Sequence, residues 1–196
     1  ITISIGNFIV YQIALVFLGS ISIICNYFLK IVDSSLLKSF IMLGFIINTS
    51  VIVVLLTISI SKKTDKTIVD FFINILSKIK VIKKPYVIKN KFHSYLIDFN
   101  RSSELLFQNK IEFIKLVLIQ LISLIALYLI PFALFMGTQI YDIKPFQDII
   151  VLSYVMLIGS FVPIPGGTGG LEFGFITFFG KFIKNSKLNA IILLDR

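Results

Sequence analysis

The chain of 196 residues is far more apolar than a typical soluble domain, because 57% of its residues are hydrophobic and its mean hydropathy is +0.96. Only 15% of the residues are charged, so long apolar runs dominate, and we predict an all-α, polytopic helical membrane protein. The net charge of +9 would suit nucleic-acid binding, but nine lysines lie between positions 62 and 91, directly after an apolar run. That placement is typical of a cytoplasmic loop lying against anionic lipid, so no direct nucleic-acid partner is expected.

Three apolar runs are long enough to cross a bilayer, which takes about 20 helical residues. They are residues 3–29, 36–60 and 111–136. Pro131 predicts a kink in the third run, which a membrane helix tolerates when neighbours satisfy the freed carbonyl. A broken apolar segment at residues 149–182 would bring the total to about four crossings. A further, truncated run builds from residue 188.

Polar residues inside the first two spans predict helix packing. Gln12 needs a hydrogen-bond partner on another helix, and a packing contact is favoured over a chemical role. Gly44 and Asn48 share one helix face at four-residue spacing, which also indicates close packing. The single cysteine, Cys25, lies in an apolar run and is most simply a small hydrophobic residue.

The only extended hydrophilic region is residues 61–110, which we predict to be a basic cytoplasmic loop. Apolar residues recur at three- and four-residue spacing from position 68 to 82, and this predicts an amphipathic helix in the interface that ends at Pro85. Residues 89–108 predict a second surface helix with Leu96, Phe99, Leu105 and Leu106 partly buried. His93 has no companion ligand for a metal site and no acid or base relay.

Charge sets the expected topology. With the lysine-rich loop in the cytoplasm, residues 137–148 form a short external loop that carries Asp142, Lys144 and Asp148. A second basic cluster follows the broken segment, at positions 181–187. That cluster favours an interrupted crossing over a re-entrant hairpin, because a hairpin would leave these lysines outside.

The broken segment contains two apolar runs that are each too short to span. Residues 149–162 and 171–182 reach roughly 21 and 18 Å as helices, against a hydrocarbon core of about 30 Å. A stretch rich in proline and glycine separates the two runs and continues into the start of the second. Its sequence is Pro163-Ile164-Pro165-Gly166-Gly167-Thr168-Gly169-Gly170-Leu171-Glu172. Lipid offers backbone amides no partner, so irregular backbone at membrane depth is buried in protein or lines a wet cavity. This stretch is therefore the candidate site.

The chemistry of the stretch suits an anionic group. The two prolines stop the helix, and the glycines permit close approach of backbone amides to a ligand. A helix that resumes at about Gly170 points its free N–H groups into the membrane, where they attract phosphate or carboxylate. Thr168 adds a hydroxyl, and Glu172 is an ionisable group in an apolar run, which marks a functional position.

Simpler readings of these residues remain open. The glycines could form a plain flexible turn, and Glu172 could only cap the new helix by accepting from its first amides. A nucleotide-binding loop is rejected because no Gly-Lys-Ser/Thr follows the glycines. No nucleophile elbow, paired catalytic carboxylates or metal-ligand cluster occurs, so we predict no catalytic residue, no metal and no cofactor.

The motif resembles a known family. The run Pro163-x-Pro165-Gly166-Gly167-x-Gly169-x-x-Glu172, followed by Leu193-Leu194-Asp195-Arg196, is similar to the lysylphosphatidylglycerol synthase transmembrane family, also called the flippase-like domain family. The resemblance implies a multi-pass domain of the bacterial cell membrane that moves lipids, in the best-known members aminoacylated phosphatidylglycerol, between leaflets. It also implies that Arg196 pairs with Glu172 or contacts lipid. The chain starts without Met and ends inside an apolar run, so we read it as part of a longer protein.

Three functions are compatible with these patterns. The first is binding and translocation of an anionic phospholipid or lysyl-phosphatidylglycerol, with Pro163, Pro165, Gly166, Gly167, Thr168, Gly169, Gly170, Glu172 and Arg196 as the binding residues. The second is the membrane part of a phosphatidylglycerol lysyltransferase, which transfers lysine from lysyl-tRNA in a separate domain. The third is a structural membrane scaffold. The membrane and its phospholipids are the expected partners, and a homo-oligomer stays open.

Overall fold

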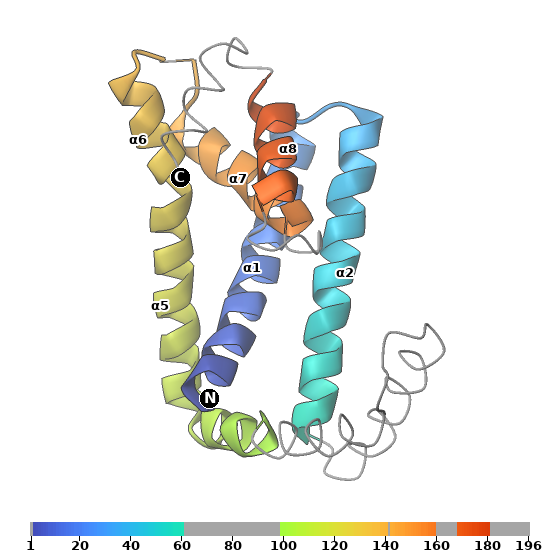
Figure 1. Cartoon of the computed structure of the whole chain (residues 1–196), viewed down its shortest axis with the longest axis vertical. Coiled ribbons are helices and arrows are strands. Elements are labelled where there is room, and N and C mark those ends of the chain that lie inside the picture. The colour runs from blue at the N-terminus through green and yellow to red at the C-terminus, as the bar shows by residue number, and fades with distance from the viewer. Residues whose placement is uncertain (1, 61–98, 141, 160–167, 181–196) are drawn as a thin grey trace. The chain divides into compact units, whose positions relative to one another are not determined.

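The computed structural model describes residues 2–60, 99–140, 142–159 and 168–180, and within these ranges every regular element is helical. The all-α fold class is confirmed. The helices, labelled in Figure 1, are α1 (Thr2–Leu29), α2 (Ser35–Ile60), α5 (Lys110–Tyr128), α6 (Ile130–Gly137), α7 (Pro145–Gly159) and α8 (Thr168–Phe179). Residues 99–108 are also helical. The predicted amphipathic helix between positions 68 and 82 lies outside the described residues.

The chain divides into two compact units. Unit 1 comprises Ile1–Val10 and Val51–Leu116, and unit 2 comprises Tyr11–Ser50 and Val117–Arg196. Helices α1, α2 and α5 each contribute residues to both units. The pair α7 and α8 belongs wholly to unit 2.

Among the described residues, three helices are long and apolar enough to cross a membrane, namely Gly6–Leu29, Ser35–Ser59 and Lys110–Gly137. They lie within a few residues of the three predicted spans. All three expose large apolar side chains, including Phe17, Ile24, Ile46, Val53, Ile119 and Ile122. So much exposed apolar surface is unusual for a protein in water and is what a lipid-facing surface requires.

Pro131 breaks the third span as predicted. Helix α5 ends at Tyr128, and Leu129, between the two helices, has φ −87° and ψ −4°. Helix α6 begins at Ile130 with Pro131 as its second residue. Proline is favoured there because the first amides of a helix have no partner within the helix. The next amide, that of Phe132, donates a hydrogen bond of 3.0 Å to the Asp148 carboxylate.

Helices α7 and α8 run antiparallel, side by side (Figure 1). Gly159 near the end of α7 meets Leu171 near the start of α8, while Val155, one turn back on α7, meets Gly174, almost one turn on along α8. The predicted interrupted crossing is therefore wrong, because its two halves would continue in one direction. Small residues at the contact let the second half-helix fold back against the first. The pair has the geometry of a re-entrant hairpin.

The predicted boundaries of this pair also need correction. Helix α7 begins at Pro145, one turn before the expected position 149, and α8 begins at Thr168, slightly before Gly170. Asp148 therefore lies in the first turn of α7 and not in an external loop. Proline at the first helical position and a carboxylate in the first turn both favour a helix start here.

Aromatic side chains join α6, α7 and α8 into the core of unit 2. Phe135 of α6 lies 5.2 Å from Phe179 of α8, measured between ring centroids, and Tyr154 of α7 lies 6.0 Å from Phe178. Such pairs add about 0.5–1.5 kcal/mol each beyond the burial of their area. The half-helices are thereby fixed to the broken third span.

The helix at residues 99–108 differs from its prediction at Leu105, and Leu96 of the predicted set lies outside the described residues. Phe99 and Leu106 are half-buried as expected, but Leu105 is exposed. Ser102 and Ser103 are buried in its place, so the inner face follows positions 99, 102, 103 and 106 at helical spacing. Leu105 falls outside that face.

Candidate functional site

The residues predicted to bind a ligand fall into two groups. Pro163, Pro165, Gly166, Gly167 and Arg196 lie outside the described residues. The others, Thr168, Gly169, Gly170 and Glu172, belong to the first turns of α8, where the structure describes the backbone. The expected helix N-terminus directly after the glycine-rich stretch is therefore present, and it begins at Thr168.

The two half-helices pack at van der Waals distance because glycine stands at their contacts. A Cβ atom at Gly159 would lie 2.5 Å from Cδ2 of Leu171, and one at Gly174 would lie 3.2 Å from Cγ1 of Val155. Both distances are shorter than ordinary carbon contacts, so neither position accepts a side chain without movement. The end of α7 and the start of α8 are thereby held close together.

A buried amide network anchors the end of α7 to α1 and α2. Asn48 of α2 donates from Nδ2 to the carbonyl oxygen of Leu157 at 3.0 Å, and its Oδ1 accepts from Nε2 of Gln12 at 2.7 Å. Asn48 and Gln12 are only 3% and 4% exposed. Leu157 lies in the last turn of α7, where carbonyls lack a partner within the helix. The broken end of α7 thus gains a side-chain donor from another span.

Two glycines make room for this anchor. A Cβ at Gly44 would lie 2.8 Å from the Leu157 carbonyl oxygen, and one at Gly19 would lie 2.9 Å from Leu157 Cδ1. The backbone of Leu157 therefore rests on α2 and its side chain on α1. The packing role predicted for Gln12, Gly44 and Asn48 is confirmed. What the sequence did not indicate is that Gly44 and Asn48 both contact the broken helix, at Leu157.

We expect Gly44→Ala to lower the free energy of unfolding by about 1–3 kcal/mol, because the new methyl group would overlap a backbone oxygen that cannot rotate away. Thermal unfolding in detergent measures the change. Gly137→Ala is the matched control, since a Cβ there meets nothing within 4 Å. Equal melting temperatures for the two variants would show that α7 does not rest on Gly44.

Two further buried groups escaped the sequence analysis. The hydroxyl of Tyr154 donates to the Ser22 carbonyl at 2.7 Å, which ties the middle of α7 to α1. Asp148 is fully buried, and its Oδ2 accepts from the Phe132 amide in the first turn of α6. A carboxylate is favoured at that position by the positive end of the helix dipole. Nothing in the apolar run around Tyr154 predicts its hydrogen bond. The place of Asp148 in the first turn of a helix could have been predicted from Pro145, three residues before it.

Taken together, these contacts define a multi-pass helical membrane domain in which a pair of half-length helices is held inside the protein by polar contacts. The family described as "Lysylphosphatidylglycerol synthase TM region" matches residues 2–196. The chain belongs to this family, as the glycine-rich motif predicts. No curated protein and no solved structure is similar enough to the chain to be matched.

Proposed function

We propose that this domain binds phospholipid and moves it between the leaflets of the bacterial cell membrane, with the start of α8 and the glycine-rich stretch before it as the binding site. The observation that carries the proposal is the antiparallel pair α7 and α8, whose ends meet where Gly159 packs on Leu171. Half-length helices that end inside a membrane protein are a recurring way to build a substrate site in transporters. Here the polar contacts from α1 and α2 keep the broken end of α7 in place.

The chemistry of the site follows from the helix N-terminus. The first amides of α8, at Thr168, Gly169 and Gly170, have no acceptor within the helix, and they suit the phosphate of a lipid headgroup. Pro163, Pro165, Gly166 and Gly167 would shape the backbone that surrounds that phosphate. Glu172 would pair with a cationic group, either the amine of lysyl-phosphatidylglycerol or the Arg196 guanidinium.

The substrate class we infer is a phospholipid with a phosphate and, in the aminoacylated form, a primary amine. Phosphatidylglycerol supplies only the first group, and lysyl-phosphatidylglycerol supplies both. The amides of α8 serve either lipid, whereas a Glu172 carboxylate would favour the aminoacylated one. This difference makes Glu172 the residue that separates the two substrates.

A second function is favoured by the description of the family. In that reading the domain is the membrane part of a phosphatidylglycerol lysyltransferase and gives a catalytic domain access to its lipid. Lysine transfer by the whole protein would then continue when the helix pair is altered. In the third reading, as a scaffold, alanine at all four motif glycines would disturb assembly but not lipid distribution.

The test is lipid movement in proteoliposomes that contain the protein and headgroup-labelled lysyl-phosphatidylglycerol or phosphatidylglycerol. We expect movement of the aminoacylated lipid, at least a tenfold loss with Glu172→Gln, and partial recovery with Glu172→Asp. Glu112→Gln is the control, because Glu112 is exposed at the start of α5 and its carboxylate forms an exposed ion pair with Lys115 at 2.9 Å. Movement no faster than in empty liposomes, with lysine transfer intact, would overturn the proposal in favour of the second function.

A further inference from the structure

A cavity of about 360 Å³ lies at the end of unit 2 where α1 passes into α2. Its charged side consists of Lys30, Asp33 and Lys38, and its apolar side includes Ile23, Ile41 and Met42. This volume falls in the range of roughly 300–1,000 Å³ that is usual for small-molecule sites. None of the residues that line it belongs to the glycine-rich motif or the α8 N-terminus.

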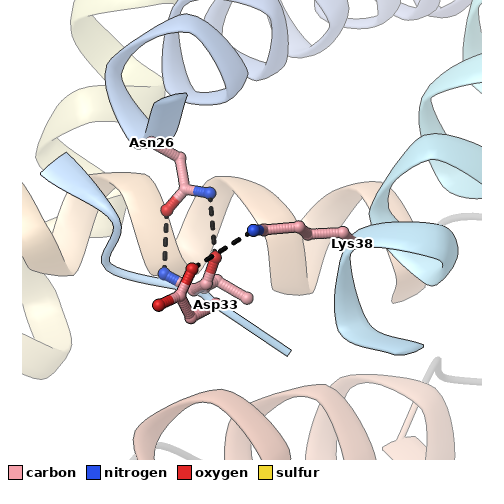
Figure 2. A network of polar contacts seen from close by, with 4 residues as sticks. Asn26, Asp33 and Lys38 are labelled. Atoms are coloured by element: carbon pink, nitrogen blue, oxygen red, sulfur yellow. Dashed lines mark hydrogen bonds and ion pairs between the residues drawn. The ribbon is translucent and has the colours of Figure 1, made fainter. Parts of the chain in front are cut away.

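The charged side is held in a fixed form. The side-chain Oδ1 of Asn26 accepts from the backbone N–H of Val32 at 2.8 Å, and its Nδ2 donates to the backbone carbonyl of Val32 at 3.1 Å (Figure 2). These two hydrogen bonds close the turn between α1 and α2. Lys30 has a positive φ of 49°, a conformation that favours glycine or asparagine after a helix. Lys30 adopts this unfavourable backbone conformation and lines the cavity with a long cationic side chain.

The charges leave the cavity with a net positive charge of one. Lys38 pairs with Asp33 at 3.3 Å, but both side chains are about half exposed or more, and such a pair contributes little to stability. Within the described part of the chain, the ammonium group of Lys30 has neither an ion pair nor a hydrogen bond. One monoanionic phosphodiester between the two lysines would neutralise the set, whereas a zwitterionic headgroup of no net charge would not.

The surroundings of the cavity indicate a lipid. Tyr27, Phe28 and Leu36 are at least 70% exposed beside the turn, and Tyr27 also lines the cavity. Tyrosine is enriched at the level where headgroups meet hydrocarbon, and apolar side chains face the hydrocarbon itself. Met42, half-exposed on the apolar side, continues the wall along α2 toward the middle of the predicted span. A headgroup in the cavity would thus have its glycerol and acyl chains beside an apolar wall.

We propose that this cavity is a second lipid site, which binds the phosphate of a monoanionic phospholipid between Lys30 and Lys38. It is separate from the translocation site and does not depend on it. If the lysine-rich loop is cytoplasmic, the cavity serves the outer leaflet, because the turn between α1 and α2 lies at the opposite end of α2. Anionic lipid bound there would be drawn from the leaflet by charge and retained by the apolar wall.

The test uses the protein in nanodiscs with phosphatidylglycerol that carries a photoreactive headgroup, and cross-linked residues are mapped by mass spectrometry. We expect cross-links within residues 23–42, reduced about tenfold in the Lys30→Gln, Lys38→Gln double variant. The control is Lys110→Gln with Lys115→Gln, which removes two exposed lysines at the start of α5. Absence of cross-links in residues 23–42, or an equal loss in the control, would overturn the proposal.

A third variant separates binding from a structural role. Asp33→Asn frees Lys38 and raises the net charge of the cavity to two, so cross-linking should increase about threefold. Loss of cross-linking in this variant would contradict the charge argument, because it would mean that the ion pair itself shapes the site.

Competition identifies the source of the phosphate. Excess unlabelled phosphatidylglycerol should suppress the cross-links, while phosphatidylcholine and inorganic phosphate should not. Suppression by inorganic phosphate would overturn the assignment to a lipid, and equal suppression by phosphatidylcholine would overturn the selection for negative charge.

Discussion

Replacing Asn48 with leucine should lower the free energy of unfolding by about 2–3 kcal/mol. The substitution removes the donor to the Leu157 carbonyl and the acceptor for the Gln12 amide, and both groups would remain in a buried, apolar environment. Leucine has the same number and branching of side-chain heavy atoms as asparagine, so it fills the site while removing both hydrogen bonds. Thermal unfolding in detergent, monitored by circular dichroism, measures it.

The control for Asn48 is Ser50→Leu on the same helix. Ser50 is exposed, and its hydroxyl donates only within α2, to the Ile47 carbonyl at 2.7 Å. A melting temperature close to that of the wild type is expected. A double-mutant cycle adds a sharper criterion: Gln12→Leu should cost much less in the Asn48→Leu background than alone. Strict additivity would show that the two amides do not depend on each other.

Asp148→Ala should destabilise the protein by about 3 kcal/mol, since it removes the acceptor from a buried helix N-terminus and leaves a cavity. Asp148→Asn keeps an oxygen acceptor for the Phe132 amide but loses the charge. It should cost about 1 kcal/mol, the part due to the helix dipole. Chemical unfolding in detergent separates the two variants.

Asp142→Ala provides the comparison for Asp148, because Asp142 is exposed in the short turn before α7. No measurable change is expected from it. If Asp142→Ala and Asp148→Ala behaved alike, the connection between α6 and α7 through the buried carboxylate would be contradicted.

Much of this fold follows from local sequence patterns. Long apolar runs specify α1, α2 and α5, and Pro131 specifies the break before α6. The prolines and glycines after position 162 predict a helix that stops and restarts. Such features depend on residues close together in the chain, so composition and spacing are sufficient to find them.

The direction of α8 depends instead on contacts between distant residues, and here the charge rule gave the wrong answer. The basic cluster at positions 181–187 favoured a crossing, but Gly174 against Val155 and Gly159 against Leu171 make the half-helices antiparallel. The spacing of Gly44 and Asn48 predicted a close contact on α2, but it could not show that the partner is Leu157 of α7. Asp148 was hidden for a related reason, because its role depends on Phe132, sixteen residues away.

The side of the membrane on which α7 begins and α8 ends tests the central claim most directly. Single cysteines would replace Phe146 and Gly180, both exposed, in a Cys25→Ser background, and a membrane-impermeant thiol reagent would be applied to intact cells. A re-entrant pair predicts that both cysteines react from outside, while Lys110→Cys at the start of α5 reacts only after the cells are opened. Reaction of Phe146→Cys from outside and Gly180→Cys only from inside would contradict the account, since α7 and α8 would then form one crossing and not a hairpin that holds a site.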